Sequence, residues 1–206
     1  MFFKLLTGMP FIGDVLRIFN AYAFRGDALA SDRFASPWLW VTAFWVQCSI
    51  SAVATVLCMP ALVNEWLPKG YCLQYEVDFQ PGPAAVSILP NLLGFGIGIY
   101  ALIFGLHKLL LRQLQDSYTP QPGVTKRSPG SALILNAEMA VPLLVLALAI
   151  VIGLGQQVFS APRWLQAMSW FSLWLSLTFT IELICTLFGL GENSILKSLA
   201  PEDPGT

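Results

Sequence analysis

Charge is scarce in this sequence. Only 11% of its 206 residues are Asp, Glu, Lys or Arg, and 56% are hydrophobic, whereas soluble globular proteins carry about 25% charged residues. This composition excludes a soluble domain and indicates an integral membrane protein. The formal net charge is −1, from 11 basic and 12 acidic residues. Because no excess of positive charge favours nucleic acid, we expect no direct nucleic-acid binding.

Histidine and catalytic motifs are also nearly absent. The single histidine, His107, is too few for zinc or di-iron sites that use several histidine ligands. The sequence contains no Gly-x-Ser-x-Gly, phosphate-loop or dinucleotide-binding motif. No activating base accompanies the hydroxyls of the last apolar run, and we interpret them as hydrogen-bond partners for other helices. They are Ser169, Ser172, Ser176 and Thr180. We therefore predict a protein that is not an enzyme and that has no metal or cofactor.

Cysteine is limited to four residues. Cys48, Cys58 and Cys185 fall in long apolar runs, and Cys72 falls between two of these runs. A disulfide between Cys58 and Cys72 would require an oxidising compartment such as the periplasm. The sequence is equally compatible with two unpaired thiols, because spatial geometry decides which cysteines pair.

Long apolar runs, by contrast, are abundant. Four runs contain the roughly 20 apolar residues that a helix needs to cross a bilayer core of about 30 Å. Helices satisfy their own backbone hydrogen bonds in lipid, and the runs are too long for the strands of a membrane barrel. The sequence therefore predicts an all-α integral membrane protein, a bundle of four transmembrane helices over residues 37–190. The spans are 37–63, 84–106, 131–155 and 164–190, and residues 191–206 form a polar cytoplasmic tail.

Basic residues are distributed unevenly between the segments that connect the spans. Lys and Arg accumulate on the cytoplasmic side of membrane proteins. Here one side has only Lys69, in an acidic outer loop over residues 64–83, and Arg163, next to the short outer connection 156–162. We therefore predict a multi-pass protein of a bacterial inner (cell) membrane with both termini in the cytoplasm. Lys126 and Arg127 are expected to contact anionic lipid headgroups. The basic residues of the cytoplasmic side are Lys4, Arg17, Arg25, Arg33, Lys108, Arg112, Lys126, Arg127 and Lys197.

The N-terminal segment, residues 1–36, begins with an apolar stretch that resembles a signal peptide. Pro10 and Gly13 interrupt this stretch too early for the apolar core of such a peptide. Further on, apolar residues recur at helical spacing with Asp14 and Arg17 on the other face. This pattern predicts an amphipathic helix in the membrane interface. The alternative is a cytoplasmic helix that packs on the bundle.

Small residues line one face of the second span. Gly94, Gly98, Ala101 and Gly105 are spaced four, three and four apart, which places them within about 60° on one helix face. Such faces let two helices approach closely in lipid. We interpret this face as a helix-packing or oligomer contact, with either another span or a second copy as its partner.

Two carboxylates lie inside the predicted spans at similar depth, Glu138 in the third and Glu182 in the fourth. An unpaired charge at this depth costs several kcal/mol, so each must be protonated, paired or hydrated. Asn136 is close to Glu138 along the chain. Three interpretations remain open. The pair neutralises His107, Lys108 or Arg112 at the inner end of the second span, lines a path for a cation or proton, or forms part of a docking surface for a cytosolic protein.

The most distinctive local string is Pro90-Asn91-Leu92-Leu93-Gly94-Phe95. In size and four-span layout, the chain resembles the small membrane subunits of bacterial anti-phage defence systems such as Kiwa. The resemblance is one of architecture over the whole chain. It implies a homo-oligomeric membrane sensor that recruits or restrains a cytosolic effector.

These features together favour a non-enzymatic, oligomeric inner-membrane subunit. It would sense a signal in the membrane or at its outer face and pass it to a cytosolic partner, in the setting of anti-phage defence. The alternative is a small ion channel or transporter that uses Glu138 and Glu182.

Overall fold

The described part of the chain is helical. The computed structural model describes residues 6–25, 30, 32–60, 64, 75, 77–106, 132–159 and 162–199. Within these residues there is no strand. The helices are α2 (Ile12–Ala23), α3 (Pro37–Cys58), α5 (Pro81–Leu106), α7 (Ala132–Val158) and α8 (Arg163–Leu199).

Four of these helices are long and apolar enough to cross a membrane. This result confirms the sequence-based prediction of four apolar helices and indicates a multi-pass membrane protein. The candidate membrane spans are Pro37–Cys58, Pro81–Ile103, Ile134–Val158 and Arg163–Glu192.

Proline explains where the helix ends differ from the predicted ones. α3 stops at Cys58 instead of residue 63, because Pro60 lacks an N–H and biases the preceding Met59 away from the helical conformation. α5 begins at Pro81 instead of residue 84, since proline fits the first turn of a helix. α8 continues past residue 190 to Leu199, and no proline precedes that end within the helix.

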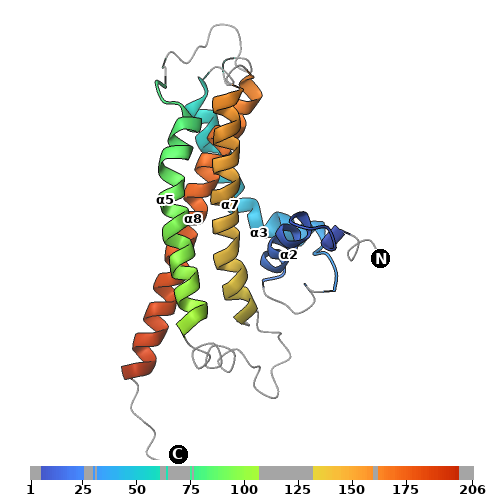
Figure 1. The fold of residues 1–206 in the computed structure, drawn as a ribbon, viewed down its shortest axis with the longest axis vertical. Coiled ribbons are helices and arrows are strands. Elements are labelled where there is room, and N and C mark those ends of the chain that lie inside the picture. Colours follow the sequence, from blue (N-terminus) through green and yellow to red (C-terminus); the bar gives the residue numbers. More distant parts are fainter. Residues whose placement is uncertain are drawn as a thin grey trace, which may run out of the picture.

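The spans form a bundle in which α8 is central. α5 packs on α7, and both α7 and α3 pack on α8. α2 packs on α7 and α3 and lies to the side of α7, while the C-terminal part of α8 extends beyond the other helices (Figure 1). Ala85, Leu89, Leu146 and Trp170 belong to the largest buried cluster, which joins α5, α7 and α8.

α5 and α7 approach closely at two glycines, Gly82 and Gly153. A Cβ on Gly153 would lie 3.0 Å from the Gly82 carbonyl oxygen and 3.0 Å from the Ala85 Cβ. Gly96 also packs against α7, because a Cβ there would meet the Leu143 side chain. Small residues therefore bring these two spans together, as is common in lipid.

The small-residue face predicted on α5 is not the face that contacts α7. Gly94, Gly98 and Ala101 are exposed, and a Cβ on Gly94 or Gly98 would have nothing within 4 Å. The surroundings of Gly105 lie outside the described residues. In the described part of the chain, this face is therefore left to lipid or to another molecule.

Candidate functional site

A polar junction of Tyr22, Gln47, Glu138 and Glu182 lies where α2 meets the bundle. The Tyr22 hydroxyl of α2 donates a 2.5 Å hydrogen bond to Oε1 of Glu182 on α8. The Gln47 amide of α3 donates to Oε2 of the same carboxylate over 2.8 Å and lies 3.4 Å from the Tyr22 hydroxyl oxygen. One intramembrane carboxylate thus joins three helices.

Glu138 of α7 completes the junction. It is half-buried and lies near enough to interact electrostatically with Glu182 and with Tyr22. The exposed Arg25, just after α2, acts with the opposite sign on Tyr22 and Glu138. The sequence placed the two carboxylates at similar depth, and the structure brings them into one electrostatic environment.

The hydroxyl of Tyr22 stays protonated in this environment. Its burial, the hydrogen bond to Glu182 and the negative charges of Glu182 and Glu138 all raise the pKa of Tyr22 above its ordinary value, with only Arg25 opposing. Burial is the largest of these causes, because it disfavours the charged phenolate. Tyr22 is therefore a permanent donor to Glu182 at neutral pH.

Aromatic rings pack beside Tyr22 at the junction. The Tyr22 ring centroid lies 5.1 Å from that of Phe44 and 6.1 Å from that of Phe179, and the Phe19 ring centroid lies 5.8 Å from that of Phe44. Apolar neighbours lower the local dielectric, and a lower dielectric strengthens a hydrogen bond.

Asn20 fixes the position of α2. Its fully buried side chain accepts a hydrogen bond from the Ala35 N–H over 2.8 Å and donates to the carbonyls of Ala30 and Arg33 over 2.9 Å each. The chain then enters α3, whose first turn is capped by the Ser36 hydroxyl. Three backbone groups thus depend on one amide for their partners.

The Gln47 amide has one unused atom. Its Oε1 is buried and has no hydrogen-bond partner among the described residues. An unsatisfied buried acceptor costs about 1–3 kcal/mol. The orientation is nevertheless the correct one for an ionised Glu182, since rotating the amide would place its oxygen against the carboxylate.

The other polar residues singled out in the sequence lie elsewhere. Asn136 accepts a 2.6 Å hydrogen bond from the Tyr100 hydroxyl, which ties α7 to α5. Cys58 is partly buried and packs against the core. The remaining predicted site residues lie outside the described part of the chain, so their roles, including the Cys58–Cys72 bridge, stay predictions. These residues are Cys72, His107, Lys108, Arg112, Lys126 and Arg127.

The hydroxyls of α8 do not join helices as we expected. Those of Ser172, Ser176 and Thr180 donate to carbonyls three or four residues back on α8 itself. Ser169 is fully buried, and its hydroxyl has no partner among the described residues. The interhelical interpretation is wrong for the three bonded residues, because the nearest carbonyl lies on their own helix.

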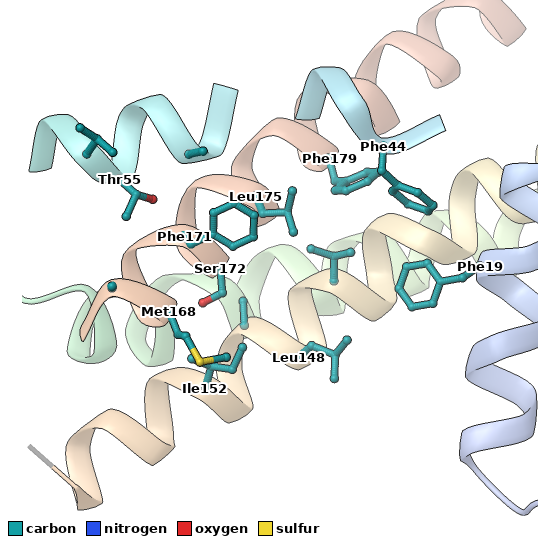
Figure 2. A pocket seen from close by; sticks show the side chains of 15 residues that line it. Phe19, Phe44, Thr55, Leu148, Ile152, Met168, Phe171, Ser172, Leu175 and Phe179 are labelled. Atoms are coloured by element: carbon teal, nitrogen blue, oxygen red, sulfur yellow. The ribbon is translucent and has the colours of Figure 1, made fainter. Parts of the chain in front are cut away.

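An apolar cavity of about 550 Å³ adjoins the junction. Figure 2 shows Met168 and Ile152 at one end and the rings of Phe19, Phe44 and Phe179 at the other. Among the residues that the structure describes, no group of three metal-binding side chains comes together.

The comparisons with known proteins leave the family of the chain open. No family model matches the sequence, and no curated protein or solved structure matches it significantly. The resemblance to membrane subunits of anti-phage systems therefore stays a prediction.

Proposed function

We propose that the chain is a non-enzymatic subunit of a bacterial inner membrane that senses a signal at the membrane and passes it to a cytosolic protein through α2. The polar junction carries this proposal, because Glu182 accepts from both Tyr22 of α2 and Gln47 of α3. A change at this carboxylate acts on a helix that lies outside the spans. The architectural resemblance to Kiwa supports a setting in anti-phage defence.

The orientation in this proposal follows from the basic residues, which favour both termini in the cytoplasm. Val158 and Arg163 then lie toward the outer face. Glu138 and Glu182 are each closer to the other end of their candidate spans, Ile134–Val158 and Arg163–Glu192, so the polar junction lies in the cytoplasmic half of the membrane.

The junction depends on the carboxylate of Glu182. Tyr22 and Gln47 both donate to it, and hydrogen bonds to a charged group contribute about 1.5–3 kcal/mol each. Removing the carboxylate, as in Glu182→Gln, weakens the contact with Tyr22 and shifts the position of α2.

The ion channel is the second candidate, and the proximity of Glu138 to Glu182 favours it. The cavity next to the polar junction argues against an ion channel. The cavity there is lined almost entirely by apolar atoms, and the hydroxyls of Thr55 and Ser172 donate to their own helices. A hydrated cation finds no ligand in this space. Cation flux into liposomes that disappears in a Glu138→Gln, Glu182→Gln double variant would establish the channel instead.

Assembly with further copies forms part of the same proposal. The face of α5 with Gly94, Gly98 and Ala101 is exposed, and small exposed faces of this kind allow close contact between helices in lipid. A homo-oligomer through this face would leave the polar junction accessible from the cytoplasm, because α2 packs on α7 and α3.

Affinity purification from the native host in mild detergent tests the proposal. The tagged wild-type chain is compared with Tyr22→Phe and with the matched variant Tyr100→Phe, whose lost hydroxyl joins α5 to α7. We expect the wild type and Tyr100→Phe to retain one cytosolic protein in equal amounts. In Tyr22→Phe, the amount of this protein retained per tagged chain should change by about tenfold, the equivalent of 1.4 kcal/mol. A chain that purifies without any cytosolic companion would contradict the proposal.

A further inference from the structure

The apolar cavity is a lateral slot in the bundle. α3 and α7 each pack on α8, with at most marginal contact to each other in the described residues. The slot between them has α8 as its floor, and Phe19 of α2 contributes to one end (Figure 2). Its volume of about 550 Å³ lies within the range of about 300–1,000 Å³ that ligand sites occupy.

The length of the slot matches half a bilayer. From Met168 to Phe179, α8 rises about 16 Å, and from Phe44 to Val56, α3 rises about 18 Å. Half of a hydrocarbon core of about 30 Å is about 15 Å. The slot is therefore about as long as the hydrocarbon of one leaflet. It begins a few residues from Cys58 and Arg163, where α3 ends and α8 begins, and it extends toward the polar junction.

The residues that line the slot favour a hydrocarbon ligand. Thr55 and Ser172 are its only residues with a hydroxyl, and both hydroxyls donate to carbonyls of their own helices. A hydrated or sugar-like ligand would lose its hydrogen bonds in this space. Val56, Leu148 and Met168 line the slot and are also exposed, so its mouth opens at the depth of the lipid chains.

We propose that this slot binds one acyl chain of an outer-leaflet phospholipid, with the end of the chain against Phe19, Phe44 and Phe179. In lipid, the free energy of binding comes from close packing and not from hydrophobic burial. Atoms that line an empty slot lack dispersion contacts, and a bound chain supplies them. A flexible chain of one leaflet fills a slot of this length and width. The assignment to the outer leaflet rests on the orientation given in the proposed function, and the acyl-chain site itself does not.

Two aromatic residues connect the slot to the polar junction. Phe44 and Phe179, which line the inner end, also contact the Tyr22 ring, and the Tyr22 hydroxyl binds Glu182. A chain that reaches these rings stabilises the position of α2, and a shorter chain does not. This regulatory consequence rests on the proposed function, with lipid composition as the signal.

Photolabelling of the full chain in proteoliposomes tests the site. The probes are phosphatidylethanolamines that carry a diazirine either near the ester or near the end of one acyl chain, in vesicles of phosphatidylethanolamine and phosphatidylglycerol. We expect saturable labelling, near Met168 and Ile152 with the first probe and near Phe19, Phe44 and Phe179 with the second. Unlabelled phosphatidylethanolamine should compete for both.

Matched variants on α3 provide the control. Val56 lines the slot, and Val53 is exposed outside it. Val56→Trp should reduce labelling by about tenfold, a loss of 1.4 kcal/mol, whereas Val53→Trp should leave it unchanged. Ala52→Phe fills the slot from another position and should act like Val56→Trp. If Val56→Trp does not fold, the photolabelling of Ala52→Phe tests the site instead.

Three outcomes would overturn the proposal. Labelling that does not saturate and is equally strong around Phe95 and Leu102, which are exposed on α5, would indicate surrounding bulk lipid only. Reversed positions of the two probes would indicate an inner-leaflet chain. Absence of labelling at the slot in a chain that is dimeric by light scattering would indicate a second copy as the occupant. None of these results bears on the comparison of Tyr22→Phe with Tyr100→Phe, which tests the proposed function. The acyl-chain site and the proposed function can therefore be rejected independently.

Discussion

The Tyr22 hydroxyl of α2 donates a hydrogen bond to the Glu182 carboxylate of α8 across 160 positions of the sequence. Gln47 of α3 donates to the other oxygen of the same carboxylate. The rings of Phe44 and Phe179 pack against the Tyr22 ring. One carboxylate of α8 therefore accepts hydrogen bonds from both α2 and α3.

Replacing Tyr22 by Phe should loosen α2 without unfolding the spans. The variant keeps the ring and loses a hydrogen bond to a carboxylate, which contributes about 1.5–3 kcal/mol. Maleimide labelling of an Ala23→Cys variant in a background without native cysteines measures the change, because Ala23 is 2% exposed. Labelling should accelerate with Tyr22→Phe and not with Tyr100→Phe. Equal rates in both variants would show that the hydroxyl does not hold α2 in place.

Stability should fall at alkaline pH through Tyr22. Its folded pKa is raised above the ordinary value of 10.0, so the neutral form is favoured in the folded chain. The resulting stabilisation is complete below about pH 10 and decreases as the pH rises above it, because the unfolded tyrosine then ionises. Thermal unfolding of the wild type should lose more stability above this pH than that of Tyr22→Phe. Parallel curves would contradict the raised pKa.

Asn20 should be required for the connection between α2 and α3. Asn20→Ala leaves one N–H and two carbonyls without their partner, at a cost of about 1–3 kcal/mol for each group that stays buried. Asn20→Asp keeps the acceptor for the Ala35 N–H and loses both donors. Hydrogen exchange at the Ala35 amide should therefore be fastest in Asn20→Ala and intermediate in Asn20→Asp. An amide equally protected in all three chains would rule out this role.

Two glycines should respond differently to a larger side chain. A Cβ on Gly153 would lie 3.0 Å from the Gly82 oxygen, whereas one on Gly98 would meet nothing within 4 Å. Gly153→Val should lower the unfolding temperature, since overpacking typically costs about 1–3 kcal/mol. Gly98→Val should leave it unchanged and reduce the oligomer fraction seen by light scattering. An unchanged oligomer would exclude the Gly98 face of α5 as the contact between copies.

The spans were predictable because the bilayer imposes their length and apolar composition. Four long apolar runs with little charge predict four membrane-spanning helices. Pro60 and Pro81 explain where α3 ends and where α5 begins. The small-residue face illustrates the limit of such patterns. Gly94, Gly96 and Gly98 are all small, and only the packed structure shows that Gly96 is the buried one.

The carboxylates of the candidate site were predictable, and their partners were not. Glu138 and Glu182 stand out because charge inside a span is costly. Tyr22 fits an apolar helical stripe, since most of a tyrosine is hydrophobic and only its hydroxyl is polar. Gln47 is uncharged and lies 135 positions from Glu182. Contacts over such separations depend on how the helices pack, which local periodicity does not specify.

The distance between α2 and α8 in a lipid membrane shows whether Glu182 controls the position of α2. Spin labels at Arg17→Cys and Glu192→Cys, both exposed positions, report this distance in proteoliposomes of the full chain without its native cysteines. We expect a narrow distance distribution in the wild type and in Tyr100→Phe, and a shifted or broadened one in Tyr22→Phe and in Glu182→Gln. Identical distributions in all four chains would contradict the claim that Glu182 controls the position of α2.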